Sequence, residues 1–247
     1  MISIIVPTLN EEESLRFLLG SLRRQTWSDF EILVVDGGSR DKTVDVAKKY
    51  KVTTIVLHGG REFKSRNIGA GLAKGEILPF TCADVIMPKD LIEKVYEKFE
   101  GNHQIIAASG PGIPYDAHII GKVEYGVYNA LRYILSKLPR PFERFSSSTN
   151  FLVVRKNSFE RVGGFDPKDI NADGLLGRNL SKLGGVAFCL DMNVFISARR
   201  MNKMGFLNFN RHYFYVLENF LPFLSETRMI KDLKQRSGKI HRKIHEE

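Results

Sequence analysis

The chain has little cysteine and no long apolar run. Among its 247 residues there are two cysteines, Cys82 and Cys189, too few for a disulfide framework and typical of a reducing cytoplasm. No apolar run approaches the 18 residues that a membrane-spanning helix needs. A strand-like run begins at residue 2 and leaves no room for a signal peptide. With 43% apolar and 26% charged residues, the composition favours a globular cytoplasmic protein.

Several site signatures are also absent. The first apolar run is followed by PTLNEEE rather than G-x-G-x-x-G, which argues against NAD or flavin binding. There is no P-loop pattern, and no glycine-rich loop of the kind found in sugar nucleotidyltransferases. Apart from the isolated pair His241 and His245, the six histidines show no ligand spacing, so no zinc site is expected.

The positive charge is concentrated in the second part of the chain. Residues 1–100 carry 15 basic and 15 acidic side chains, whereas residues 101–247 carry 22 and 13 and hold the whole net charge of +9. Such a region indicates an anionic partner, either a phosphate-bearing substrate or an acidic membrane face, or only a solvated basic surface. No nucleic-acid-binding motif accompanies it, so we expect no nucleic acid partner.

Short apolar runs alternate with helical patterns in the first hundred or so residues. The predicted strands are nearly continuously apolar, as buried parallel strands are: 2–6, 30–35, 53–57, 76–80 and 104–108. This order predicts an α/β fold with a parallel sheet covered by helices and ligands at the carboxyl ends of the strands. Helix starts are predicted at Asn10 and Asp41 as caps, and at Pro88 in a first turn.

Two aspartates stand at predicted strand ends, Asp36 in VVDGGSRDKT and Asp84 in PFTCADVIMP. A carboxylate facing a cleft can accept a hydrogen bond from a base or ribose, or hold a divalent cation against a diphosphate. Each also has a simpler interpretation. D-G-G-S is ordinary turn chemistry, and Asp84 could cap the helix that follows it.

Three motifs occur in order over residues 1–100: VPTLNEEE, VVDGGSRDKT and SRNIGAGLAKGEILPFTCADVIMP. Together they resemble family 2 glycosyltransferases of the GT-A fold. A weaker similarity continues to about residue 190, through FLVVRKNSFERVGGFDP and ADGLLGRNLSKLG. The resemblance implies a Rossmann-like sheet flanked by helices. It also implies sugar transfer from a nucleoside diphosphate sugar with inversion, assisted by Mn²⁺ or Mg²⁺.

The resemblance also implies site residues. Those expected to bind the sugar donor are Pro7, Thr8, Glu12, Asp36, Arg61, Arg66, Ala83 and Asp84. Within this set Asp36 would take the base N–H and Asp84 would hold the metal. Asp173 matches the catalytic base, although it could instead be the N-cap of a helix through Leu180. Arg61 and Arg66 could equally be ordinary surface arginines.

Two positions depart from the family pattern. Cys82 replaces the first carboxylate of the metal-binding D-x-D, and Ala172 replaces the acidic neighbour of Asp173. One carboxylate with a diphosphate and waters can still hold Mg²⁺. Cys82 itself could be a small buried apolar residue or a soft metal ligand. These departures leave open a non-catalytic nucleotide-sugar-binding or scaffold protein.

The second half is expected to build the acceptor side. A long helix is predicted over residues 118–138, followed by LPRPFERF, SSSTN and a strand at 151–154, and the acceptor residues would be Arg140, Arg144 and Asn150. Asp173 as a base favours a hydroxyl acceptor on a glycan or lipid-linked sugar. The basic charge favours the alternative acceptor, a polyprenyl phosphate, which needs no base.

We expect one GT-A domain over residues 1–205, with a nucleotide-binding half at 1–100 and an acceptor half at 101–205. A helical extension would follow at 206–247. Residues 206–224 carry seven aromatic side chains, which indicate either an interfacial helix on the inner membrane face or a stripe packed on the domain. Residues 226–247 could be a membrane-surface helix, an oligomer contact or a frayed terminus.

Overall fold

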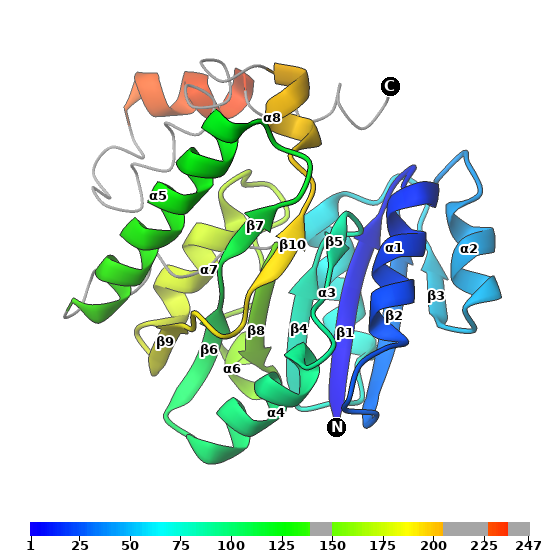
Figure 1. Cartoon of the computed structure of the whole chain (residues 1–247), viewed down its shortest axis with the longest axis horizontal. Helices are drawn as coiled ribbons and strands as arrows, with labels where there is room; N and C mark the ends of the chain where they lie inside the picture. Colours follow the sequence, from blue (N-terminus) through cyan, green and yellow to red (C-terminus); the bar gives the residue numbers. More distant parts are fainter. Residues whose placement is uncertain (139–149, 205–226, 237–247) are drawn as a thin grey trace.

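A computed structural model describes residues 1–138, 150–204 and 227–236 of the chain, and shows a central sheet with helices on both faces (Figure 1). The sheet has seven strands in the order β3-β2-β1-β4-β8-β6-β9. Their bounds are β1 Ile2–Thr8, β2 Phe30–Asp36, β3 Thr53–Val56, β4 Ile77–Thr81, β6 Ile105–Ser109, β8 Phe151–Arg155 and β9 Gly185–Phe188. A smaller sheet has the order β5-β10-β7. It consists of β5 Val85–Ile86, β7 Gly112–Pro114 and β10 Val194–Ile196.

The helices pack on the two faces of the larger sheet or beside the smaller one. They are α1 Glu12–Leu22, α2 Thr43–Lys49, α3 Glu62–Leu72, α4 Leu91–Gly101, α5 Ile119–Lys137, α6 Lys156–Arg161, α7 Ala172–Leu180 and α8 Arg199–Met204. The long helix predicted at 118–138 corresponds to α5. In the part of the chain that the structure describes, no helix is long and apolar enough to cross a membrane.

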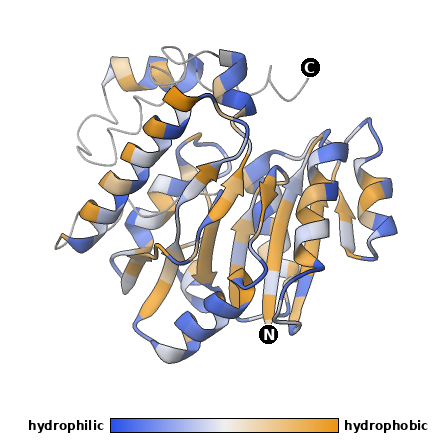
Figure 2. Ribbon diagram, viewed as in Figure 1, coloured by the Kyte–Doolittle hydropathy of each residue, from blue (hydrophilic) through white to orange (hydrophobic). Residues whose placement is uncertain are grey.

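Alternation along each strand divides the core into two layers. Ile4 and Val6 of β1 pack in one layer with α1, α2 and α4, whereas Ile5 packs in the other with α3, α6 and α7. Successive side chains of a strand point to opposite faces, so a strand covered on both sides is apolar throughout. Figure 2 shows mostly apolar strands between helices in which apolar and polar residues alternate.

The sheet is not wholly parallel, which corrects the prediction. β8 runs antiparallel to both neighbours, with Thr81 of β4 opposite Phe151 and Ser109 of β6 opposite Leu152. The run FLVV is continuously apolar because both faces of β8 are covered. That pattern reads the same in either direction, so it could not reveal the orientation of the strand.

Two predicted helix starts were wrong. α1 begins at Glu12, and Asn10 adopts a left-handed φ of 54° with its Oδ1 accepting the Arg40 N–H at 2.9 Å. α4 begins at Leu91, three residues after Pro88. Asp41 lies one residue before the N-cap of α2, and its carboxylate accepts the first N–H groups of both α1 and α2, at 3.1 and 3.0 Å.

Candidate functional site

The carboxyl ends of three neighbouring strands meet at one edge of the larger sheet. Thr8, the last residue of β1, lies opposite Asp36, the last residue of β2. β4 pairs with the other side of β1. The chain thus passes from β3 on one side of β1 to β4 on the other, and ligands of open α/β sheets bind in the crevice at such a switch point.

Asp36 is fully buried and accepts four hydrogen bonds. Oδ1 accepts the N–H groups of Gly38 and Ser39 at 2.9 and 2.8 Å. Oδ2 accepts the hydroxyls of Thr8 and Ser39 at 2.9 and 2.5 Å. A carboxylate offers about four lone-pair sites, so the turn and Thr8 of β1 together fill all of them. To read a base, Asp36 would have to exchange one of these hydroxyls for the base N–H.

Other residues expected at the nucleoside lie around this turn. Pro7 is half-buried in β1, and Arg61 is exposed at the N-cap of α3. Glu12 accepts hydrogen bonds from Arg16 at 2.7 Å and from the Lys42 N–H at 3.3 Å. Glu12 therefore joins α1 to the loop before α2.

Arg66 was expected to meet the sugar donor, but the structure places it beneath the C-A-D segment with a fully buried side chain. It donates to the Thr81 carbonyl at 3.1 Å, to Cys82 Sγ at 3.3 Å and to Glu62 at 2.8 Å. A buried guanidinium needs such partners to offset its lost hydration. Arg66 therefore holds the end of β4 in place.

Cys82 is partly exposed, and its sulfur accepts a hydrogen bond from Arg66. Burial raises the pKa of this thiol to about 12, which keeps it protonated at neutral pH. Ala83 is buried at the centre of the motif.

Asp84 is bridged to Glu11 by a single arginine that the sequence analysis did not identify. Arg199 Nε lies 3.2 Å from Asp84 Oδ2, while one terminal nitrogen lies 2.8 Å from Glu11 Oε2 and the other bonds Oε1. Burial raises the pKa of Asp84, the charge of Arg199 lowers it and that of Glu11 raises it again. The only signals in the sequence were the acidic run NEEE and the S-A-R-R after a short apolar run.

The smaller sheet explains how Arg199 reaches this position. β10 pairs antiparallel with β5, with Ile196 opposite Val85. The Ser197 N–H then donates to the Asp84 carbonyl at 3.2 Å. Two segments far apart in the chain are thus joined by strand pairing immediately beside the carboxylate.

The residues at this edge fit a divalent cation that is held partly by protein carboxylates and partly by the phosphates of a substrate. Carboxylate oxygens suit Mg²⁺ and Mn²⁺, and Mg²⁺ is commonly held by one or two carboxylates plus substrate phosphates. One guanidinium contacts both Asp84 and Glu11, which places the two carboxylates on the same side of the site. Among the residues described, no group of three or more His, Cys, Asp or Glu side chains is arranged to hold a metal.

Asp173 lies in the first turn of α7, whose N-cap position is Asn171. It is half-buried, and its Oδ1 accepts the Gly174 N–H at 2.9 Å. Arg132 of α5 faces the same region and is buried over the Phe188 ring at 4.6 Å. Burial lowers the pKa of Arg132, whereas the charges of Tyr128 and Asp173 act in the opposite direction. Asp173 therefore has a buried guanidinium in its surroundings. The signal in the sequence was that Arg132 interrupts an apolar helical pattern.

The expected acceptor residues are only partly within the described chain. The Asn150 carbonyl accepts the Thr81 hydroxyl at 3.0 Å, so Asn150 lies beside the end of β4. Arg140, Arg144 and the aromatic residues of 206–224 lie outside the described residues. Of the expected extension, Lys234 contacts Asp169, before α7, at 2.8 Å.

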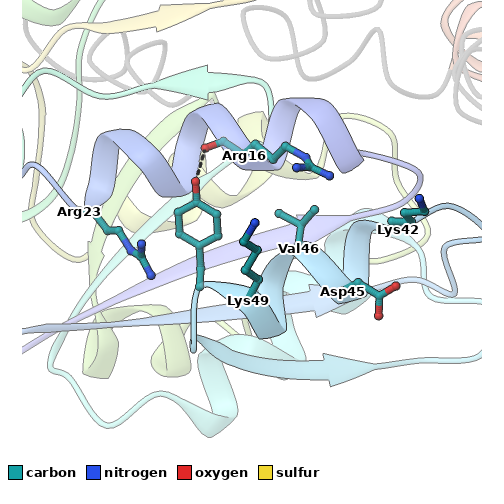
Figure 3. Close-up of a pocket in the computed structure, with 7 residues that line it drawn as sticks. Arg16, Arg23, Lys42, Asp45, Val46 and Lys49 are labelled. Carbon is teal, nitrogen blue, oxygen red and sulfur yellow. Dashed lines mark hydrogen bonds between the residues drawn. The ribbon is translucent and has the colours of Figure 1, made fainter.

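A hollow of about 280 Å³ lies elsewhere, between α1 and α2 (Figure 3). It is lined by Arg16, Arg23, Lys42, Asp45, Val46, Lys49 and Tyr50. The Tyr50 hydroxyl donates to the Arg16 carbonyl at 3.4 Å, and Arg23 lies over the Tyr50 ring at 4.4 Å. No residue expected in the site lines this hollow, which is a gap between packed helices with a basic rim.

Comparisons with known proteins agree with this geometry. A family model described as "Glycosyl transferase family 2" matches residues 3–163. A "PGL/p-HBAD biosynthesis glycosyltransferase" of Mycobacterium tuberculosis is 37% identical over 111 residues, which cover 42% of this chain and 43% of the relative. The "Poly(ribitol-phosphate) beta-N-acetylglucosaminyltransferase TarS" of Staphylococcus aureus is 30% identical over 126 residues, covering 45% and 22%. The chain thus matches less than half the length of these relatives.

Solved structures confirm the predicted GT-A fold class. A mannosyltransferase from Pyrobaculum calidifontis, in complex with GDP-Man and Mn²⁺, has a TM-score of 0.67 at 18% identity, covering 92% of this chain and 65% of that one. S. aureus TarS 1–349 with UDP-GlcNAc has a TM-score of 0.66 at 17% identity, covering 97% and 72%. At these identities the likeness concerns the fold.

Proposed function

Because the chain belongs to glycosyl transferase family 2, we propose that it transfers a sugar from a nucleoside diphosphate to an acceptor hydroxyl with inversion. The observation that carries the proposal is that Thr8 and Asp36 end adjacent strands at the switch point of the sheet, where Asp84 follows β4 on the other side of β1. The solved relatives that bind GDP-Man and UDP-GlcNAc share this fold and support the same class of sugar donor.

The sugar donor would lie across the ends of β1, β2 and β4. The turn built on Asp36 and Thr8 would receive the nucleoside. Asp84 would hold a divalent cation on the diphosphate, and a bound cation offsets the charge that develops on this leaving group. Arg66 would keep Asp84 in register through its bonds to the end of β4.

Asp173 would receive the proton of the attacking hydroxyl. Arg132 is the buried positive charge in the surroundings of this carboxylate. General-base catalysis of this kind contributes about 10²–10⁴ in rate. The same guanidinium favours a second candidate, transfer to a polyprenyl phosphate, because it could instead bind an anionic acceptor.

The acceptor side supports peripheral contact with a membrane and a lipid-linked acceptor. α5 carries large apolar side chains that are exposed along much of its length: Ile119, Ile120, Val123, Val127, Tyr128, Leu131 and Ile134. We call these residues the α5 stripe. An exposed apolar helix face in a basic region suits the interface of an anionic membrane.

Thermal denaturation with uridine and guanosine diphosphates and their sugars, with and without Mn²⁺, tests the proposal. A ligand that binds only the native state adds about 2.7 kcal/mol at a hundred times its Kd. We expect one nucleotide series to raise Tm and Mn²⁺ to raise it further. Asp84→Ala should lose the Mn²⁺ increment, whereas Glu97→Ala, on the exposed side of α4, should keep it. If no nucleoside diphosphate or sugar raises Tm, the proposal is wrong.

A further inference from the structure

Arg199 occupies the position where positive charge would be needed in the proposed cation site. Its guanidinium contacts both Glu11, which follows β1, and Asp84, which follows β4. Glu11 is only 6% exposed and Asp84 21%. Carboxylates withdrawn from water to this extent need a positive partner. Arg199 bonds both of them, and the charge of Arg200 also acts on Asp84.

The backbone at the root of this side chain is anchored. Asp116 accepts the Ser197 hydroxyl at 2.6 Å and the Ala198 N–H at 2.5 Å, which holds the chain between β10 and α8. The Arg199 side chain is still 34% exposed. An arginine with a fixed root and a partly exposed stem can change partners through its side-chain torsions alone.

A divalent cation and this guanidinium compete for the same oxygens. Nε contacts Asp84 Oδ2 and the two terminal nitrogens contact both oxygens of Glu11. A cation bound there would meet a like charge at short range, where repulsion is strong. A diphosphate offers the guanidinium an alternative partner, since phosphate oxygens accept bidentate hydrogen bonds from arginine.

We propose that Arg199 is a tethered cation that blocks metal binding until the sugar donor arrives, when its guanidinium transfers from Glu11 and Asp84 to the diphosphate. The released Glu11 then supplies the second carboxylate that Cys82 does not. Metal binding is thereby conditional on the nucleotide. The transfer step rests on the proposed function, whereas the block rests only on the ion pairs that Arg199 makes with Glu11 and Asp84.

Mn²⁺ binding measured by the electron paramagnetic resonance of free Mn²⁺ tests this without any turnover. Coupling between sites is commonly 5–150-fold. Without nucleotide, we expect Arg199→Gln to bind Mn²⁺ about tenfold or more tightly than wild type. Adding Glu11→Gln to that variant should remove the gain. Arg24→Gln, a control that removes the same charge from an exposed position after α1, should behave as wild type.

Arg199→Lys covers the case in which Arg199→Gln does not fold. A lysine keeps the charge but cannot bridge two carboxylates with a planar fork, so Mn²⁺ binding should tighten to a smaller extent. Uridine and guanosine diphosphates are then added in separate titrations. The better of the two should strengthen Mn²⁺ binding in wild type by a larger factor than in either Arg199 variant.

The outcomes separate the two proposals. Equal Mn²⁺ affinity of wild type and the folded Arg199 variants without nucleotide overturns the block. If the nucleotide still strengthens Mn²⁺ binding equally in all of them, the proposed function stands and only the role of Arg199 is wrong. If neither wild type nor the variants bind Mn²⁺, with or without nucleotide, the cation site is wrong in both proposals.

Discussion

Asp84 illustrates how a residue of a ligand site can lower the free energy of unfolding of the protein. Its carboxylate is largely buried, and that burial raises its pKa despite the neighbouring Arg199. A carboxyl with a raised pKa binds its proton more tightly in the folded chain than in the unfolded chain. The free energy of unfolding therefore falls as pH rises from the ordinary pKa of an aspartate in the unfolded chain to the raised pKa of Asp84 in the folded chain. A function that requires the charged form explains why such a group is kept.

Asp84→Asn should accordingly raise Tm at neutral pH in the absence of ligands. The gain should be absent below about pH 4, where the wild-type carboxyl is protonated in both states, and should grow as pH rises. Thermal denaturation between acidic and neutral pH measures it. Asp90→Asn is a control of opposite sign, because the hydrogen bond from Lys94 lowers the pKa of Asp90. A difference between wild type and Asp84→Asn that does not vary with pH contradicts the explanation.

Asp173 should affect chemistry rather than binding of the sugar donor. Asp173→Asn keeps the shape of the side chain but cannot accept a proton at neutral pH. With a hydroxyl acceptor, turnover should fall about 10²–10⁴-fold, while the nucleotide-dependent rise in Tm stays the same. Asp169→Asn, which removes a carboxylate paired with Lys234, is the control. A small loss of turnover would favour the phosphate acceptor, and a loss of nucleotide binding would reveal a structural role.

The packing of α3 on β1 links the core to the site, because α3 carries Arg66. A Cβ added at Gly69 would lie 2.6 Å from Ile5 Cγ2 and 3.2 Å from Val35 Cγ2. Ile5 and Val35 are both fully buried. The helix can therefore approach the sheet closely enough for Arg66 to reach the end of β4 only because residue 69 has no side chain.

Gly69→Ala should lower the free energy of unfolding by about 1–3 kcal/mol, the usual effect of overpacking a core. Gly71→Ala is a matched control in the same helix, where a Cβ would meet nothing within 4 Å. It should instead add about 0.5–1 kcal/mol through helix propensity. Urea denaturation measures both. If the two substitutions have effects of the same sign, the close packing of α3 is not what limits position 69.

For the molecule as a whole, the α5 stripe determines how it would meet a membrane. Replacing Val127 and Ile134, 65% and 58% exposed, by glutamate should at least halve co-sedimentation with vesicles containing phosphatidylglycerol. Phe17→Glu, at a position on α1 that is 62% exposed, should have no effect. Raising the salt should weaken binding of the wild type, because part of the attraction is electrostatic. Equal sedimentation of all variants contradicts the membrane role of the stripe.

The sequence by itself was enough for the layers and the family. Strand positions followed from apolar runs, because burial is a local property. Asp36 was correctly placed at the end of a strand, whereas Asp84 lies three residues after β4 and directly before β5. Local pattern was less informative for boundaries and direction. Asn10 and Pro88 are residue types that favour a helix start, but both lie outside the helices. The run FLVV could not reveal that β8 is antiparallel.

Only the tertiary structure decided which charges meet. Arg199 lies 188 positions from Glu11 in the chain, and the two meet because β10 pairs with β5 beside Asp84. Arg66 bonds the end of β4 from α3, and the charge of Arg132 on α5 acts on Asp173. An ion pair forms only where the strands and helices that carry its two residues come together. A linear sequence pattern shows neither this arrangement nor the burial that makes a charged partner necessary.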